Sequence, residues 1–454
     1  MGWGRGLRGL SRWRVLLATV LCLAAGLPPA TAQDNGRYTG VASCAGSTCH
    51  GRAEGNGAVV RQDEIATWQE LSSPSGAHSR ALSVLGSLRG RQIAATLGLG
   101  DPSAEPACLG CHATYVPVAE RGPRFQLSDG VGCESCHGAA GGWIATHYTT
   151  GGSHAANVAA GLVPLEDPQT RARVCLDCHY GSAKGNQFVT HRMMAAGHPR
   201  IVFELDLFSA LQQHHDEDPD YAQRKRRTDS VTLWAVGQAE AVRRSTNLFA
   251  RPGFGTEGVF PEFTFYDCHS CHRQITDGPQ RRLTFETNPA RPIPFGQPPF
   301  NDENIIMLSA VSRVLAPAQA DGFEAASREF HRAMGEGRQE AAGAATKLSG
   351  AAGTLSDALA RSDGEDAFTI IAAIADRTTS PRFTDYAGSS QAVMAIDTLL
   401  NALVRQGRIT VGAAAGIRAD INAAYDAVRS PESYNPVRFR ASLGQAAGAI
   451  GKLQ

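Results

Sequence analysis

The 454-residue sequence has no excess of charge of either sign, because 43 Lys and Arg residues balance 43 Asp and Glu residues. A nucleic-acid-binding protein would show a basic excess or a basic stripe, so the balance argues against that class of function. The sequence also has no long hydrophobic run beyond residue 32. It therefore predicts no membrane-spanning helix in that part of the chain.

The first residues have the pattern of an export signal. Four arginines between residues 5 and 14 precede an apolar stretch, residues 15–27, and Ala30-Thr31-Ala32 is a small-residue cleavage site. The apolar stretch is shorter than a membrane-spanning helix requires. We expect residues 1–32 to be a signal peptide that is cleaved near Ala32, which makes the protein periplasmic or otherwise exported. A retained N-terminal anchor is the alternative.

Cysteine is scarce outside one repeated pattern. Of the 11 cysteines, Cys22 lies in the predicted signal peptide, and the other ten form five pairs that are each followed by a histidine. Four of the five motifs read C-x-x-C-H, and the first has four residues between its cysteines. The motifs are Cys44, Cys49 and His50; Cys108, Cys111 and His112; Cys133, Cys136 and His137; Cys175, Cys178 and His179; and Cys268, Cys271 and His272.

This spacing predicts covalently attached haem. The two thiols of such a motif add to the two vinyl groups of one haem, and the adjacent histidine binds the iron. A disulfide framework is the usual expectation for an exported protein, but it does not require the histidine. A zinc knuckle does not require it either, and a thioredoxin-like redox site needs only one cysteine pair. We therefore expect five molecules of haem c in one chain.

The motifs divide the chain into regions and predict a mainly α-helical protein. Residues 33–286 form a pentahaem cytochrome domain, rich in loops and short helices, in which haem faces replace much of the aliphatic core. Residues 287–302 form a Pro-rich linker. Residues 303–454 are Ala-rich and contain no cysteine, and they predict an α-helical bundle of four or five helices.

One helix of the predicted bundle has a clear signature. Four apolar residues share one helix face, with serines before them as a start signal and Gly407 after them as a stop signal. The four apolar residues are Val393, Ile396, Leu400 and Leu403.

Nine further histidines are available as second axial ligands. A haem iron with two protein ligands is a dedicated electron carrier, whereas an open position permits substrate binding. The nine are His78, His147, His154, His191, His198, His214, His215, His269 and His331. They decide whether the protein is a carrier or an enzyme.

Part of the chain resembles a known family. The segment Gly130-Val-Gly-Cys-Glu-Ser-Cys-His-Gly138, followed by His147, is similar to the tetrahaem cytochrome c-554 family of nitrogen-oxidising bacteria. The second and fourth motifs support the likeness, as does Ala77-His78-Ser-Arg-Ala81 after Trp68. The resemblance covers roughly residues 40–200. The fifth motif and the predicted bundle lie outside it.

The resemblance implies which histidine binds which iron. It implies His147 as second ligand for the first motif, His78 for the third and a downstream histidine, for which we take His198, for the fourth. It also implies that the iron held by His112 has an open sixth position.

The resemblance does not assign the remaining histidines to an iron, so their roles are inferred from the sequence alone. His154 and His191 stay candidate ligands, and one of His214 and His215 is a candidate for the fifth haem. We expect His269 to point away from that iron and His331 to be structural. A thioether ligand from Met193 or Met194 is a further alternative.

The sequence favours an electron carrier that relays electrons between a periplasmic or membrane-bound donor and an acceptor protein. The alternative is an oxidoreductase that acts on a small nitrogen or sulfur compound at an open iron of His112. No C-x-x-C-K motif is present, which argues against ammonia-forming nitrite reduction. A third hypothesis makes the C-terminal helices the contact through which the protein joins a larger complex.

Overall fold

The computed structural model describes the chain in several stretches separated by gaps. They are residues 1, 36–55, 61–215, 229–254, 262–273, 297–364, 366–381 and 383–454. Within these stretches the protein is helical and has no β-strand, only two isolated bridges. This confirms the predicted mainly α-helical class. The predicted signal peptide and most of the Pro-rich linker lie outside the described residues.

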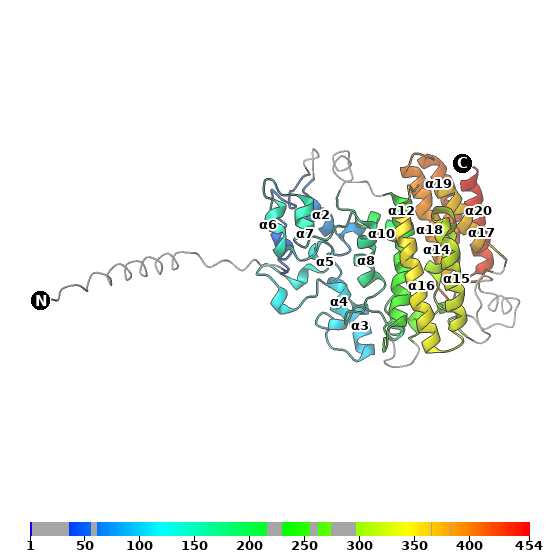
Figure 1. The fold of residues 1–454 in the computed structure, drawn as a ribbon, viewed down its shortest axis with the longest axis horizontal. Helices are drawn as coiled ribbons and strands as arrows, with labels where there is room; N and C mark the ends of the chain where they lie inside the picture. The colour runs from blue at the N-terminus through cyan, green and yellow to red at the C-terminus, as the bar shows by residue number, and fades with distance from the viewer. Residues whose placement is uncertain are drawn as a thin grey trace.

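The N-terminal half is built from short helices joined by loops (Figure 1). Capping residues fix where these helices begin. Ser87 accepts a hydrogen bond from Gly90 N at the start of one helix, and Asp167 accepts one from Thr170 N at the start of another. The helices are η1 (Val41–Ser43), α2 (Glu64–Gln69), η2 (Pro74–Gly76), η3 (Ser83–Gly86), α3 (Leu88–Leu97), α4 (Pro106–His112), η4 (Val118–Glu120), η5 (Leu127–Asp129), α5 (Glu134–His137), η6 (Ala140–Gly142), α6 (Ile144–His147), α7 (His154–Ala159), α8 (Pro168–His179), α9 (His191–Ala195) and α10 (Leu205–Leu211).

Aliphatic side chains make only small cores in this half. One buried cluster consists of Leu85, Leu109 and Ala113. A second centres on Leu176 and Phe203, where α8 and α10 meet the following long helix. Most of the buried apolar residues belong instead to one large cluster that begins at Val231. The N-terminal half therefore has little aliphatic core of its own, in keeping with the expectation from the cysteine motifs.

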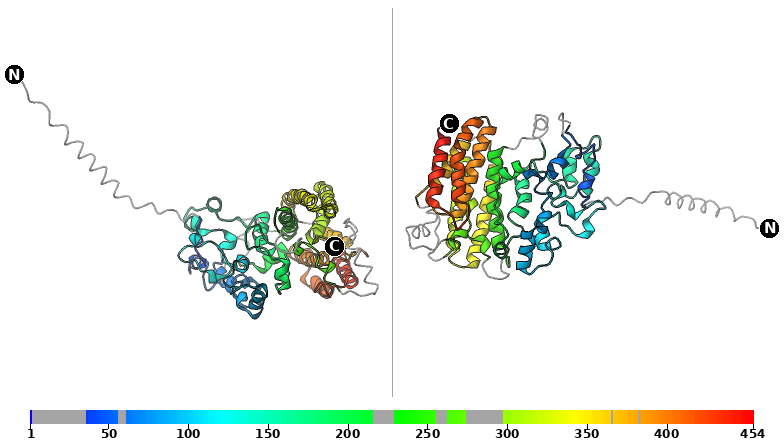
Figure 2. Two further views of the ribbon diagram at one scale, coloured as in Figure 1. Left: turned by 90° about the horizontal axis from the view of Figure 1, so that it is seen from below. Right: turned by 180° about the vertical axis from the view of Figure 1, so that it is seen from behind.

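The C-terminal half is a bundle of long helices (Figures 1 and 2). From residue 303 on, the described residues form seven helices rather than the four or five expected. The extra ones arise because breaks are short: α15 starts at Pro317, directly after α14 has ended at Leu315. The seven helices are α14 (Glu303–Leu315), α15 (Pro317–Ala333), α16 (Arg338–Leu359), α17 (Ala367–Thr378), α18 (Tyr386–Arg405), α19 (Val411–Ala427) and α20 (Pro436–Gly451).

The helix α12 (Ser230–Ala250) joins the two halves. Although it lies within residues 33–286, the predicted cytochrome domain, it packs against α16 and α14 of the bundle on one side. On the other side it packs against α8 and α10 (Figure 1). A buried hydrogen bond of 2.8 Å from Asn304 Nδ2 to Gln238 Oε1 ties it to α14. No helix in the described part of the chain is long and apolar enough to cross a membrane.

The helix predicted from its apolar face is α18. The four apolar residues that predicted this helix are fully buried: Val393, Ile396, Leu400 and Leu403. The helix starts earlier than Ser389, because Asp385 is the N-cap and accepts a hydrogen bond from Gly388 N at 2.6 Å. Gly407, with φ of 70°, follows its end in the left-handed conformation that glycine tolerates.

The bundle core yields a stability prediction. Leu348 of α16 is fully buried, so replacing it with alanine (L348A) removes apolar contacts and leaves a cavity. We expect the free energy of unfolding to fall by about 2–5 kcal/mol, measured by urea denaturation followed by circular dichroism. The control V411A alters a side chain that is 73% exposed on α19, and it should change stability by less than about 0.5 kcal/mol. Equal effects of the two variants would contradict the packing described here.

Candidate haem sites

Three of the five cysteine motifs lie at the C-terminal ends of helices. The histidines of the second, third and fourth motifs are the last residues of α4, α5 and α8. In a helix, residues i, i+3 and i+4 share one face, so both cysteines and the histidine point to the same side. This places the two attachment points and the metal ligand of each motif together.

The first and fifth motifs reach a similar arrangement through turns. In the first, the four-residue spacer folds back, and His50 N donates to Cys44 O at 3.2 Å. In the fifth, η8 (Cys268–Ser270) is a single turn, and His272 N donates to Cys268 O at 2.8 Å. The ten cysteines are free thiols, and none of them forms a disulfide bond with another described residue.

Each motif histidine faces another histidine. The ring centres are 6.1 Å apart for His50 and His147, 6.4 Å for His112 and His198, 6.1 Å for His179 and His78, and 6.2 Å for His272 and His191. His137 faces two neighbours, with ring centres 6.3 Å from His214 and 6.1 Å from His215.

These separations fit one metal ion between each pair. A metal–imidazole bond is about 2 Å long, and each ring nitrogen lies about 1 Å from its ring centre, so two imidazoles on opposite sides of one ion have centres about 6 Å apart. Nitrogen atoms of His137, His214 and His215 also lie within 4.8 Å of one another, a grouping that suits a metal. The residues present therefore fit five haem groups held by cysteine pairs and histidine pairs.

Of the three pairs that the family resemblance implies, the structure forms only the first. His147 lies beside His50, as expected. His78, expected at the third motif, faces His179 of the fourth. The loop before His78 accepts a 3.0 Å hydrogen bond at Pro74 O from Gln212, which follows α10. His214 and His215 lie at the third motif instead of the fifth.

The second motif differs most from the expectation of an open iron. His198, expected at the fourth motif, faces His112 instead. The turn after α9 is anchored to α3, because Arg89 donates to Gly197 O at 3.0 Å through Nε. This contact brings His198 to α4, which is far away in the sequence.

His154 and His191 were both candidate ligands, and only His191 joins a histidine pair. His191, the first residue of α9, faces His272 of the fifth motif. His154 instead forms an ion pair with Glu166 and faces no motif histidine. His269 points to the bundle, where its Nδ1 lies 2.7 Å from Pro431 O, and His331 is buried beside Asp302.

The second ring nitrogen of several paired histidines is held by an oxygen atom. Nδ1 of His112 lies 2.7 Å from Ala81 O, Nδ1 of His198 2.8 Å from Pro199 O, and Nδ1 of His214 2.8 Å from Gln212 O. A histidine whose Nδ1 is engaged in this way presents Nε2 to a metal. The sequence motifs contain no signal for these partners.

Glu64 holds two of these histidines at once. Its Oε2 lies 2.9 Å from His50 Nδ1, and its Oε1 lies 3.3 Å from His215 Nδ1. Burial alone would raise the pKa of Glu64, but the hydrogen bonds from His215 and His50 hold it below its usual range, so the carboxylate is ionised. The hydrogen bond to Glu64 in turn raises the pKa of His50.

Burial favours the neutral form of several other paired histidines. Burial lowers the pKa of His179 to about 4, and the neighbouring His78 contributes to the shift. Burial likewise lowers the pKa of His214 to about 4 and lowers that of His78 and His198. Neutral imidazole is the form that binds a metal.

The cysteines show which motifs are neighbours. A hydrogen bond between the thiols of Cys44 and Cys133 lowers the pKa of the first and raises that of the second. Cys111 and Cys178 are linked in the same way. Cys136 is buried, which together with nearby Cys178 raises its pKa to about 11. The first motif therefore lies near the third, the third near the fourth and the fourth near the second.

Glu134, inside the third motif, holds the first and third motifs together. It is 5% exposed. Its carboxylate accepts hydrogen bonds from Gly40 N at 2.7 Å, Thr39 N at 2.8 Å and Ala140 N at 2.7 Å. One buried carboxylate thus satisfies three backbone donors that would otherwise lack partners.

The fifth motif rests on the bundle. Asp267 Oδ1 accepts a 3.4 Å hydrogen bond from Ala387 N of α18, and the His269 ring packs edge-on against Tyr434 with centres 5.0 Å apart. Nearby, Arg200 forms a 2.8 Å ion pair with Glu303 of α14. The helices after residue 303 therefore form one wall of the fifth site.

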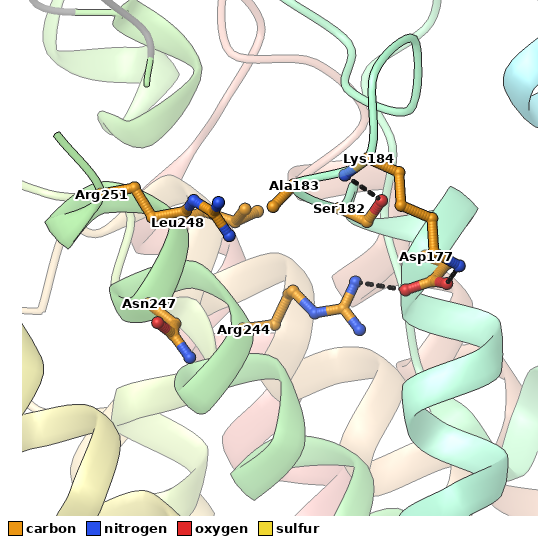
Figure 3. A pocket seen from close by; sticks show the side chains of 8 residues that line it. All are labelled: Asp177, Ser182, Ala183, Lys184, Arg244, Asn247, Leu248 and Arg251. Carbon is orange, nitrogen blue, oxygen red and sulfur yellow. Dashed lines mark hydrogen bonds and ion pairs between the residues drawn. The ribbon is translucent and has the colours of Figure 1, made fainter. Parts of the chain in front are cut away.

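A surface pocket adjoins the fourth motif but has the wrong chemistry for a haem site (Figure 3). Its volume is about 270 Å³, and it lies between the end of α8 and the end of α12. Arg244 donates to Asp177 Oδ1 at 2.8 Å, and Lys184 pairs with Asp177 Oδ2 at 2.8 Å. Neither cysteine nor histidine lines the pocket, so its ion pairs serve to fasten the fourth motif to α12.

The comparison with known proteins agrees with this chemistry. Residues 43–138 match the family model described as cytochrome c554 and c-prime, a stretch that contains the first three motifs. No curated protein and no solved structure matches the chain. The match confirms the resemblance over this stretch: residues 43–138 are similar to c554-type multihaem cytochromes, a class with covalently bound haem that transfers electrons.

Proposed function

We propose that this multihaem c-type cytochrome binds five haems, each with two histidine ligands, and acts as a dedicated electron carrier. The observation that carries the proposal is the set of five facing histidine groups, one at each cysteine motif. Haem supplies one-electron redox chemistry when bound. The chain would supply the cysteines that attach each haem and two histidines to bind each iron.

Two filled axial positions favour a carrier over an enzyme. An oxidoreductase needs an iron position that substrate can enter. The position most suited to that role was the one opposite His112, and His198 lies there, its ring centre 6.4 Å from that of His112. Burial also lowers the pKa of His198, which favours the neutral form that binds a metal.

The order of neighbouring motifs supports a relay. The cysteines of the sites lie near one another in the order first, third, fourth and second. The second and fifth sites share one segment, because His191 begins α9 and His198 follows its end. Electrons would then pass between the first site, at the outer end of the N-terminal half, and the fifth site, against the bundle.

The location and partners of the carrier follow from the same proposal. We place the protein in the periplasm or outside the cell, after removal of the predicted signal peptide, which lies outside the described residues. Its partners would be a periplasmic or membrane-bound electron donor and an acceptor protein. The bundle, which contacts the fifth site, is the surface on which we place docking to a larger complex.

Haem content and spin state test the proposal. The pyridine haemochrome assay should give five haems per chain, and electron paramagnetic resonance of the oxidised protein should show only low-spin ferric haem. The reduced protein should not bind carbon monoxide, because no axial position is open. A high-spin signal that disappears on addition of nitrite or hydroxylamine would instead support the oxidoreductase.

Removal of His198 should open one iron. In H198A, we expect one of five haems to become high-spin and the reduced protein to bind one equivalent of carbon monoxide, monitored by absorption spectroscopy. The matched control is H154A, because His154 pairs with Glu166 and faces no motif histidine. It should keep the wild-type spectrum. The ligand assignment fails if H198A stays fully low-spin or if H154A opens an iron.

The export proposal has a separate test. Protein purified from the periplasmic fraction should begin at Gln33, directly after the predicted cleavage site, when its intact mass and N-terminal sequence are measured. Recovery of the protein from membranes with residues 1–32 still attached would show that the segment is an anchor.

A further inference from the structure

The carboxylate of Glu64 lies between histidines that belong to two different sites. His50 is the motif histidine of the first site, and His215 faces His137 of the third. Glu64 is 5% exposed and hydrogen-bonds to Nδ1 of both, at 2.9 Å to His50 and 3.3 Å to His215.

We propose that Glu64 is a positioning residue shared by two haem sites, which selects His215 over His214 as the partner of His137 and lowers the reduction potentials of both irons. This inference rests on the proposed function, in which each iron has two histidine ligands.

The position of Glu64 is set by the backbone. Glu64 is the first residue of α2, and Ile65 N, next to it, donates to His50 O at 3.0 Å. The backbone of α2 is thus tied to the same histidine whose ring the carboxylate holds. Because both contacts involve His50, the orientation of its ring is restrained from two sides, and Nε2 is directed away from Glu64.

The choice between His214 and His215 follows from their Nδ1 partners. Both rings lie at a suitable distance from His137, at 6.3 Å and 6.1 Å between centres. His214 has a neutral partner, the carbonyl of Gln212, whereas His215 has the carboxylate of Glu64. Hydrogen bonds to a charged group are roughly twice as strong as neutral ones, and a carboxylate partner makes an imidazole a stronger metal ligand.

The effect on both potentials follows from charge. A buried anion next to a ligand favours the more positively charged oxidised iron. Arg61 and Asp63, which directly precede α2, form their own ion pair at 3.2 Å. The carboxylate of Glu64 is shared by His50 and His215. Its charge therefore acts on two of the five sites together.

The test uses the full-length protein with its haems and the variant E64Q, which keeps the shape of the side chain and removes its charge. In a spectroelectrochemical titration, we expect the midpoint potentials of two of the five haems to rise. A tenfold change in the equilibrium constant between the oxidised and the reduced haem corresponds to a shift of about 59 mV in its one-electron midpoint potential. The midpoint potentials of the other three haems should not change, and all haems should stay low-spin.

A matched control separates this effect from the loss of any carboxylate beside a histidine. Glu166 pairs with His154, which faces no motif histidine, so E166Q should leave all five potentials unchanged. Unchanged potentials in E64Q, or shifts as large in E166Q, would overturn the inference. Neither result would affect the haem count and spin state of the unaltered protein, on which the proposed function depends.

Two histidine variants test the choice of ligand if E64Q does not fold. H215A should change the resonance spectrum and potential of one haem, since His214 or water takes the vacated position. H214A should leave both as they are in the unaltered protein. The inference is wrong if H214A, rather than H215A, alters the third site.

Discussion

Two imidazole rings that face each other about 6 Å apart are the constraint on which the N-terminal half of this protein depends. Each motif supplies one ring from the end of a helix or turn, and a distant part of the chain must deliver the other. The pair of His50 and His147 joins the first loop to α6, and that of His112 and His198 joins α4 to the turn after α9. Loops and short helices, with small aliphatic clusters between them, suit a chain that must return to every site.

Oxygen atoms around the histidines complete this arrangement. Backbone carbonyls engage Nδ1 of His112 and His198, and one carboxylate, Glu64, serves His50 and His215. Such contacts set which nitrogen faces a metal, and a charged partner also alters how readily the metal is oxidised. The same groups that orient the rings therefore tune their chemistry.

The bundle supports the fifth site, whereas the other sites are supported by neighbouring motifs. The first four motifs are connected through their cysteines, whereas the fifth contacts α18 through Asp267 and Tyr434 through His269. The long helix α12 packs on both halves, so the bundle and the motif region share one interface. The bundle is thus part of the scaffold of the fifth site, a role that its Ala-rich sequence did not reveal.

The sequence by itself determined the attachment chemistry, the α-helical class and helix α18, because each depends on residues a few positions apart that share one helix face or turn. Only the tertiary structure decided which histidines face one another. His198 reaches His112 because Arg89 anchors the turn after α9, and Glu64 meets His215 although the two are far apart in the sequence. Such pairings depend on how whole segments pack, and no local pattern of residues encodes that packing.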